Sequence, residues 1–238
     1  MPLATRTALP TVATSRARAL APDIGRPAST LPRFDVERFW DADSTPPALA
    51  CLSRKLGDLL PGARTPEIEA AIVLASLMHD VGYYYGGNST DRDRVDDTFG
   101  LQIRHFVGKL KPGDEDAARA AARTAAIDVA AVQLGGGCPF NQPYSWSYAF
   151  AGHDRGYASH LPDEDAKIRA IARGTFADVV AQIAACDFEP SEVLKGKLAK
   201  APAAYQRRFL DAMVRLAKAV QTDLKAGKAN TIPGFGDD

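Results

Sequence analysis

Histidine is scarce in this 238-residue chain, with four in all and none before residue 79. Cysteine is scarcer still: Cys51, Cys138 and Cys186 are odd in number and scattered, which argues against a disulfide framework and favours reduced thiols. No apolar run approaches the roughly 20 residues that span a bilayer, so we expect a soluble protein with no membrane partner. The 29 basic and 29 acidic side chains cancel, which disfavours a nucleic-acid partner.

Acidic residues are also missing from the N-terminus, where the first is Asp23. An acid-poor segment rich in Arg, Ser, Thr, Ala and Pro cannot bury enough apolar surface to fold alone, so we expect a disordered or weakly ordered leader over residues 1–40. A single domain would then cover 41–228, with a tail at 229–238. We expect a cytoplasmic protein. The alternative is a leader that directs import into an organelle or export by a specialised secretion system.

The rest of the chain has helical periodicity and no convincing strand pattern, so the predicted fold class is all-α. The last two helices are amphipathic, which predicts core packing or, alternatively, a homodimer seam through a C-terminal helix. A long non-helical stretch at 135–162 contains the aromatic loop from Phe140 to Phe150. The predicted helices cover residues 47–60, 65–80, 91–110 and 114–134, and two more carry the apolar residues from Ile168 to Ile183 and from Tyr205 to Leu224.

The helix at 65–80 has an apolar run from Ala70 to Met78 that predicts a central, surrounded position. His79 and Asp80 follow it. A second acid, Asp128, lies within an alanine-rich helix, and burying an unpaired carboxylate costs several kcal/mol. A cation between Asp128 and the His79-Asp80 pair would explain both placements. The alternatives are that His79 caps its helix and that Asp128 bonds a hydroxyl or an arginine.

Residues 68–83, which read IEAAIVLASLMHDVGY, resemble the signature helix of the HD-domain superfamily. The resemblance implies an HD-like helical bundle, here with additional C-terminal helices. In that superfamily a His-Asp pair, an Asp from a later helix and a His from an earlier helix ligate a metal that activates water. It therefore implies metal ligation by His79, Asp80 and Asp128, with Asp80 also catalytic, and hydrolysis of a small phosphate ester.

The earlier histidine of that family is missing here. Cys51, His105 and Asp96 are the candidate substitutes. On their helix His105 projects about 120° from the apolar stripe, whereas Asp96 lies about 60° from its centre. The cofactor is expected to be a divalent metal ion, with Mn, Mg, Fe and Zn left open.

The substrate is expected to be a small phosphorylated molecule, with a nucleotide as one candidate. Arg54 and Arg92 are candidate phosphate donors, and Tyr83 and Trp146 are candidate aromatic contacts. Two other functions stay open. One is a metal-free HD-like binding module or secreted effector that uses the aromatic loop, and the other is an HD-type iron oxygenase.

Overall fold

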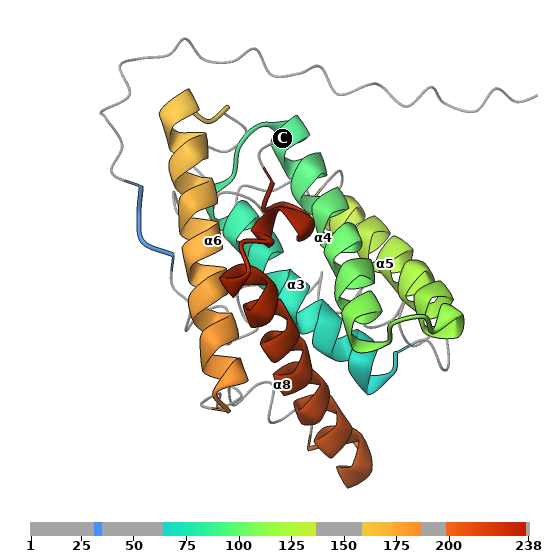
Figure 1. Ribbon diagram of the computed structural model, residues 1–238. Helices are drawn as coiled ribbons and strands as arrows, with labels where there is room; N and C mark the ends of the chain where they lie inside the picture. Colours follow the sequence, from blue (N-terminus) through green and yellow to red (C-terminus); the bar gives the residue numbers. More distant parts are fainter. Residues whose placement is uncertain (1–30, 35–63, 137–158, 187–198, 237–238) are drawn as a thin grey trace, which may run out of the picture. The chain divides into compact units, whose positions relative to one another are not determined.

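The computed structural model describes residues 31–34, 64–136, 159–186 and 199–236, and these form helices without a strand (Figure 1). The predicted all-α class is confirmed for these residues. None of their helices is long and apolar enough to cross a membrane. The helix predicted at 47–60 and the aromatic loop lie outside the described residues. The described elements are α3 (Pro66–Tyr85), α4 (Ser89–Leu110), α5 (Glu115–Gly136), α6 (Pro162–Ala184), α8 (Ala203–Lys225) and the 3₁₀ turn η4 (Ala229–Thr231).

Helix α3 begins where the sequence predicts and ends later than predicted. The Thr65 side chain accepts a hydrogen bond from the Ile68 amide at 3.3 Å, and a proline occupies the first turn. The predicted end at Asp80 is wrong, because the helix continues to Tyr85 and stops at Gly86, whose φ is 69°. His79 and Asp80 therefore lie within a helix.

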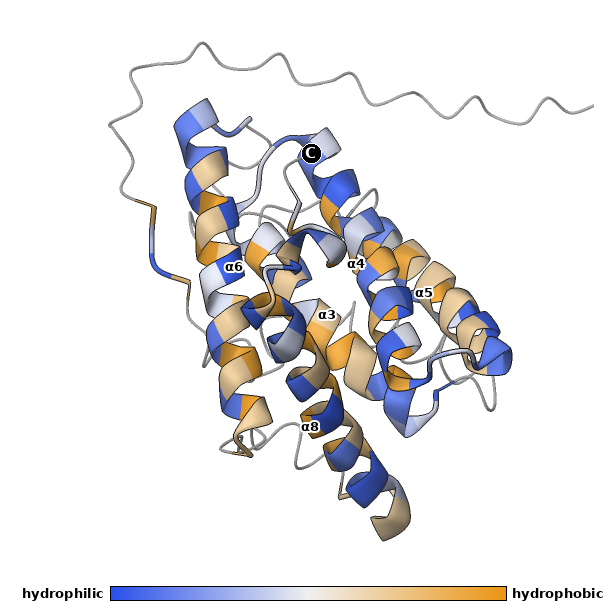
Figure 2. Cartoon of the chain, in the orientation of Figure 1, coloured by the Kyte–Doolittle hydropathy of each residue, from blue (hydrophilic) through white to orange (hydrophobic). Residues whose placement is uncertain are grey.

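The predicted central position of α3 is confirmed, because α3 packs against α4, α6 and α8. Helix α5 packs on α4, and α6 packs on α8. Figure 2 shows a largely apolar α3 between helices that also carry hydrophilic residues. An apolar helix buries its surface only when neighbours cover it on several sides.

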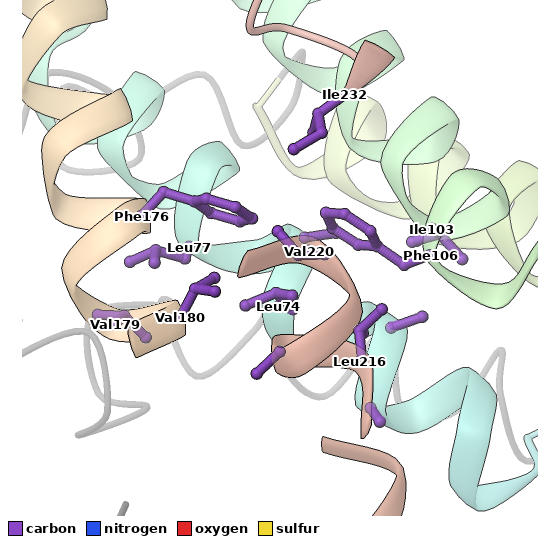
Figure 3. Packing of buried hydrophobic residues seen from close by; sticks show 14 of the residues in the cluster. Leu74, Leu77, Ile103, Phe106, Phe176, Val179, Val180, Leu216, Val220 and Ile232 are labelled. Atoms are coloured by element: carbon purple, nitrogen blue, oxygen red, sulfur yellow. The ribbon is translucent and has the colours of Figure 1, made fainter. Parts of the chain in front are cut away.

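The core contains side chains of α3, α4, α6 and α8, which pack against one another (Figure 3). Phe106 of α4 and Phe176 of α6 stack with ring centroids 6.1 Å apart. Leu74, Leu77 and Val220 are fully buried in the same cluster. Each such side chain contributes about 1.5–3 kcal/mol on leaving water, which fixes the helices that carry the polar cluster described below.

Both ends of the described chain pack on this core. Phe235, within the predicted tail, is 5% exposed, and its ring centroid lies 5.0 Å from that of Phe176. Residues 31–34, within the predicted leader, lie against the end of α3. There the hydroxyl of Tyr85 donates to the Pro32 carbonyl at 2.7 Å.

Candidate active site

A polar cluster lies where α3 passes α4, in the interior of the helical unit. His79 of α3 is 9% exposed and Asp96 of α4 is fully buried. The Nε2 atom of His79 lies 3.0 Å from Oδ1 of Asp96. Sequence geometry predicted that Asp96 would lie near the buried face of its helix, and its burial confirms this placement.

Aromatic side chains hold the imidazole in place. The hydroxyl of Tyr83, one turn beyond His79, donates to the same Asp96 oxygen at 2.8 Å. The Tyr83 ring stacks on the imidazole with centroids 4.3 Å apart, and Phe99 approaches to 4.9 Å. Residues four apart on a helix share a face, so α3 itself brings Tyr83 and His79 together.

The two nitrogens of His79 face different carboxylates. Nε2 contacts Asp96, whereas Nδ1 lies 3.4 Å from Oδ1 of Asp80, which is long for a hydrogen bond. The Asp80 side chain is 25% exposed, so the Nδ1 side of the ring is the wetter one. When the ring is neutral, this arrangement favours the tautomer in which Nε2–H donates to Asp96 and Nδ1 carries the lone pair.

The carboxylates also control the charge of the ring. Burial by itself lowers the pKa of His79, because it disfavours the charged form. Hydrogen bonds to Asp80 and Asp96, together with their negative charges, outweigh burial and raise the pKa of His79 to about 9. The ring is therefore protonated at pH 7 and can accept a proton only as the pH approaches 9.

Local sequence explains why α3 and α4 approach so closely at this point. A Cβ atom on Gly82 would lie 2.6 Å from Val95 Cγ2, so only glycine fits there. The turn between the helices is fixed by a capping box in which Asn88 and Asp91 each accept from the other's amide at 2.9 Å. Asp96 thereby comes opposite His79.

Asp128 belongs to a different cluster, at the other end of α3. It is 4% exposed, and its Oδ1 accepts from Nη2 of Arg64 at 2.7 Å. Burial raises the pKa of Asp128 to about 6. The positive charge of Arg64 opposes this rise, and the negative charge of Glu69 adds to it. Glu69 precedes His79 by ten residues, about 15 Å along the helix. The open alternative that Asp128 bonds an arginine is the one observed.

The ligand set implied by the HD-domain resemblance does not fit the described residues. Asp80 and Asp96 approach opposite edges of the His79 ring, so they do not converge on one lone pair. Asp128 is occupied by Arg64. Among the described residues, no group of three or more His, Cys, Asp or Glu is arranged to hold a metal ion. The metal site stays a prediction from sequence.

The remaining candidates lie elsewhere on α4 or outside the described residues. His105 is half-buried on α4, two turns and more from Asp96, with its Nε2 atom unpartnered. Arg92 Nη2 lies 3.4 Å from the exposed Asp93. Cys51, Arg54 and Trp146 fall outside the described residues. Sequence reasoning missed Arg64, because the residues that it contacts come together only in the tertiary fold.

No protein-family model, curated protein or solved structure matched this chain. The resemblance to the HD-domain superfamily therefore rests on residues 68–83 alone.

Proposed function

We propose that the chain is a hydrolase of neutral carboxylic esters in which His79 is the general base. One observation carries the proposal: the buried Asp96 carboxylate orients the imidazole through Nε2 and leaves Nδ1 facing the wetter side. A carboxylate-oriented imidazole is a recurrent device for taking a proton from a nucleophile.

In the proposed reaction, Nδ1 of His79 takes a proton from a water molecule while the water oxygen bonds to the ester carbonyl carbon. Asp96 stabilises the resulting imidazolium, and Tyr83 fixes Asp96. The carbon then releases the alkoxide as the C–O bond breaks, and the imidazolium returns the proton to that oxygen. The products are a carboxylic acid and an alcohol, so atoms and protons balance.

The charges around His79 support a neutral substrate. Among the described residues, its ring contacts the carboxylates of Asp80 and Asp96 and the aromatic rings of Tyr83 and Phe99. Two negative charges repel a phosphate dianion, whereas an ester carbonyl carries no net charge.

The second candidate is the metal-dependent phosphohydrolase that the HD resemblance implies. The observation that favours it is that Oδ2 of Asp96 and Oδ2 of Asp128 are buried without a hydrogen-bond partner. Unsatisfied buried carboxylate oxygens are free to bind a cation. That candidate requires Arg64 to leave Asp128.

The test is a hydrolysis screen on the full chain with p-nitrophenyl butyrate and p-nitrophenyl phosphate, each with EDTA, Ca²⁺, Mg²⁺ or Mn²⁺. We expect turnover of the butyrate ester that is lost in His79→Gln. His79→Asn is the second variant, and circular dichroism checks that both are folded. Turnover of the phosphate ester alone would replace the proposal with the second candidate, and no turnover of either would favour a binding protein.

A further inference from the structure

A hollow lies away from the His79 cluster, between α4, α5 and the C-terminal segment. Its volume is about 360 Å³, within the range of small-molecule sites. Its walls are Leu101, Arg104 and His105 of α4, Ala118 and Ala122 of α5, and Pro233.

Leu101 gives this hollow an exposed apolar surface. It is 50% exposed, against 39% for Leu210 and 37% for Leu161, the other large apolar side chains exposed among the described residues. The small Ala118 and Ala122 opposite leave room above it. Single exposed leucines are ordinary, but this one lies in a concave site.

His105 gives the hollow an unsatisfied polar atom. Its Nε2 is buried and has no hydrogen-bond partner. A buried unpaired group of this kind costs about 1–3 kcal/mol unless a ligand or water satisfies it. Burial and the charge of Lys109 lower the pKa of His105, against the opposing effect of Asp223. The ring is therefore neutral at pH 7. Because Nε2 is closed off from solvent, its N–H becomes a donor to a ligand when the ring turns toward the hollow.

Arg104 supplies a positive charge at the hollow. It is exposed, and within the described part of the chain it makes no ion pair or side-chain hydrogen bond. Lys109, one turn further along α4, is already paired with Asp223. The hollow thus combines one available guanidinium, one N–H donor and an apolar wall, which complements an anionic head on an apolar body.

We propose that the hollow formed by α4, α5 and Pro233 binds a small amphipathic carboxylate, with Arg104 and His105 on the carboxylate and Leu101 on the apolar body. This site is separate from His79 and Asp96, and the proposal does not depend on the ester hydrolase proposal.

The test is a titration of the isotope-labelled full chain with 4-phenylbutyrate, followed by NMR of the Leu101 methyl groups and the His105 ring. We expect saturable shifts of both. Neutral 4-phenylbutyramide and acetate should bind at least about tenfold more weakly, because each lacks one half of the recognition.

Arg104→Gln should weaken 4-phenylbutyrate binding by about tenfold or more, since it removes a charge-assisted hydrogen bond. Arg123→Gln is the matched control, because Arg123 is an exposed guanidinium of α5 outside the hollow, and it should bind as the wild type does. The proposal is overturned if no saturable shift occurs at millimolar probe, if the amide binds as well as the acid, or if Arg104→Gln binds normally.

Discussion

Two buried acids lie at opposite ends of α3, and they differ in the cation that each contacts. Asp96 is fully buried against the imidazole of His79, whereas Asp128 is 4% exposed and contacts the guanidinium of Arg64. An imidazole gains and loses its proton in the accessible pH range, but a guanidinium keeps its charge. The Asp96 cluster is therefore equipped for proton transfer, and the Asp128 cluster joins α5 to the segment before α3.

The largest expected effect separates the two acids by activity. Asp96→Asn should lower kcat/KM for p-nitrophenyl butyrate by about 10⁴-fold, because an amide no longer selects the Nε2–H tautomer of His79. Asp128→Asn should change it by less than about tenfold, since Asp128 contacts Arg64 and not the base. Equal losses in both variants would mean that the two acids serve one site.

The next effect concerns stability at the Asp128 end. Arg64→Ala should lower the free energy of unfolding at pH 8 by about 3 kcal/mol, because it leaves a buried carboxylate uncompensated. Burial raises the pKa of Asp128 to about 6, so at pH 5 the folded chain holds Asp128 protonated and the loss should shrink. Urea unfolding at both pH values measures this.

The control for Arg64 is the double variant Arg64→Ala with Asp128→Asn. It carries no ionisable group at residue 128, so the loss that Arg64→Ala causes relative to Asp128→Asn should be the same at pH 5 and pH 8. A loss that is the same at pH 5 and pH 8 in the single variant would show that Arg64 stabilises the fold by packing and not by charge.

At the His79 end, stability depends on pH because neighbouring carboxylates, and not burial, raise the pKa of the ring. The pKa of His79 is raised from 6.5 to about 9 in the folded chain, so its stabilising contribution is complete below pH 6.5 and is lost as pH rises through 9. The change is at most about 3 kcal/mol. Over the same range ester hydrolysis should rise, because only the neutral ring accepts a proton.

His79→Gln supplies the reference for that measurement. Its unfolding free energy should be flatter between pH 6.5 and 9 than that of the wild type. If the two proteins lose stability in parallel over this range, another group titrates there.

A smaller effect tests the close approach of α3 and α4 beside His79. Gly82→Ala places a methyl group 2.6 Å from Val95 Cγ2 and should cost about 1–3 kcal/mol, because overpacking displaces the helices. Gly108→Ala is the matched control on α4. Nothing lies within 4 Å of the added atom there, so that variant should gain about 0.5–1 kcal/mol. Thermal melts of both variants test whether α3 and α4 pack this closely at Gly82.

The smallest effect concerns Tyr83. Tyr83→Phe removes the 2.8 Å hydrogen bond to Asp96 while keeping the ring stacked on His79. We expect a loss of about 1 kcal/mol in stability and about tenfold in kcat/KM. An unchanged kcat/KM would show that His79 and Asp96 hold their geometry without the phenol.

The sequence predicted much of this fold and part of the site. Periodicity located the described helices, because an amphipathic or wholly apolar pattern depends on local spacing. The end of α3 was missed, because Gly82 does not end the helix: Val95 of α4 leaves room there only for glycine, and the helix ends at Gly86. Helical geometry placed Asp96 near the core. It did not identify His79 as its partner, because that contact joins two helices.

The most direct test of the central claim is ¹⁵N NMR of the His79 ring as a function of pH, with and without Zn²⁺ or Mg²⁺. We expect that Nε2 keeps its hydrogen throughout, and that Nδ1 loses its proton near pH 9 in the absence of metal. An Nε2 that loses its hydrogen when the metal ion is added would contradict it, because His79 would then be a metal ligand and not a base oriented by Asp96.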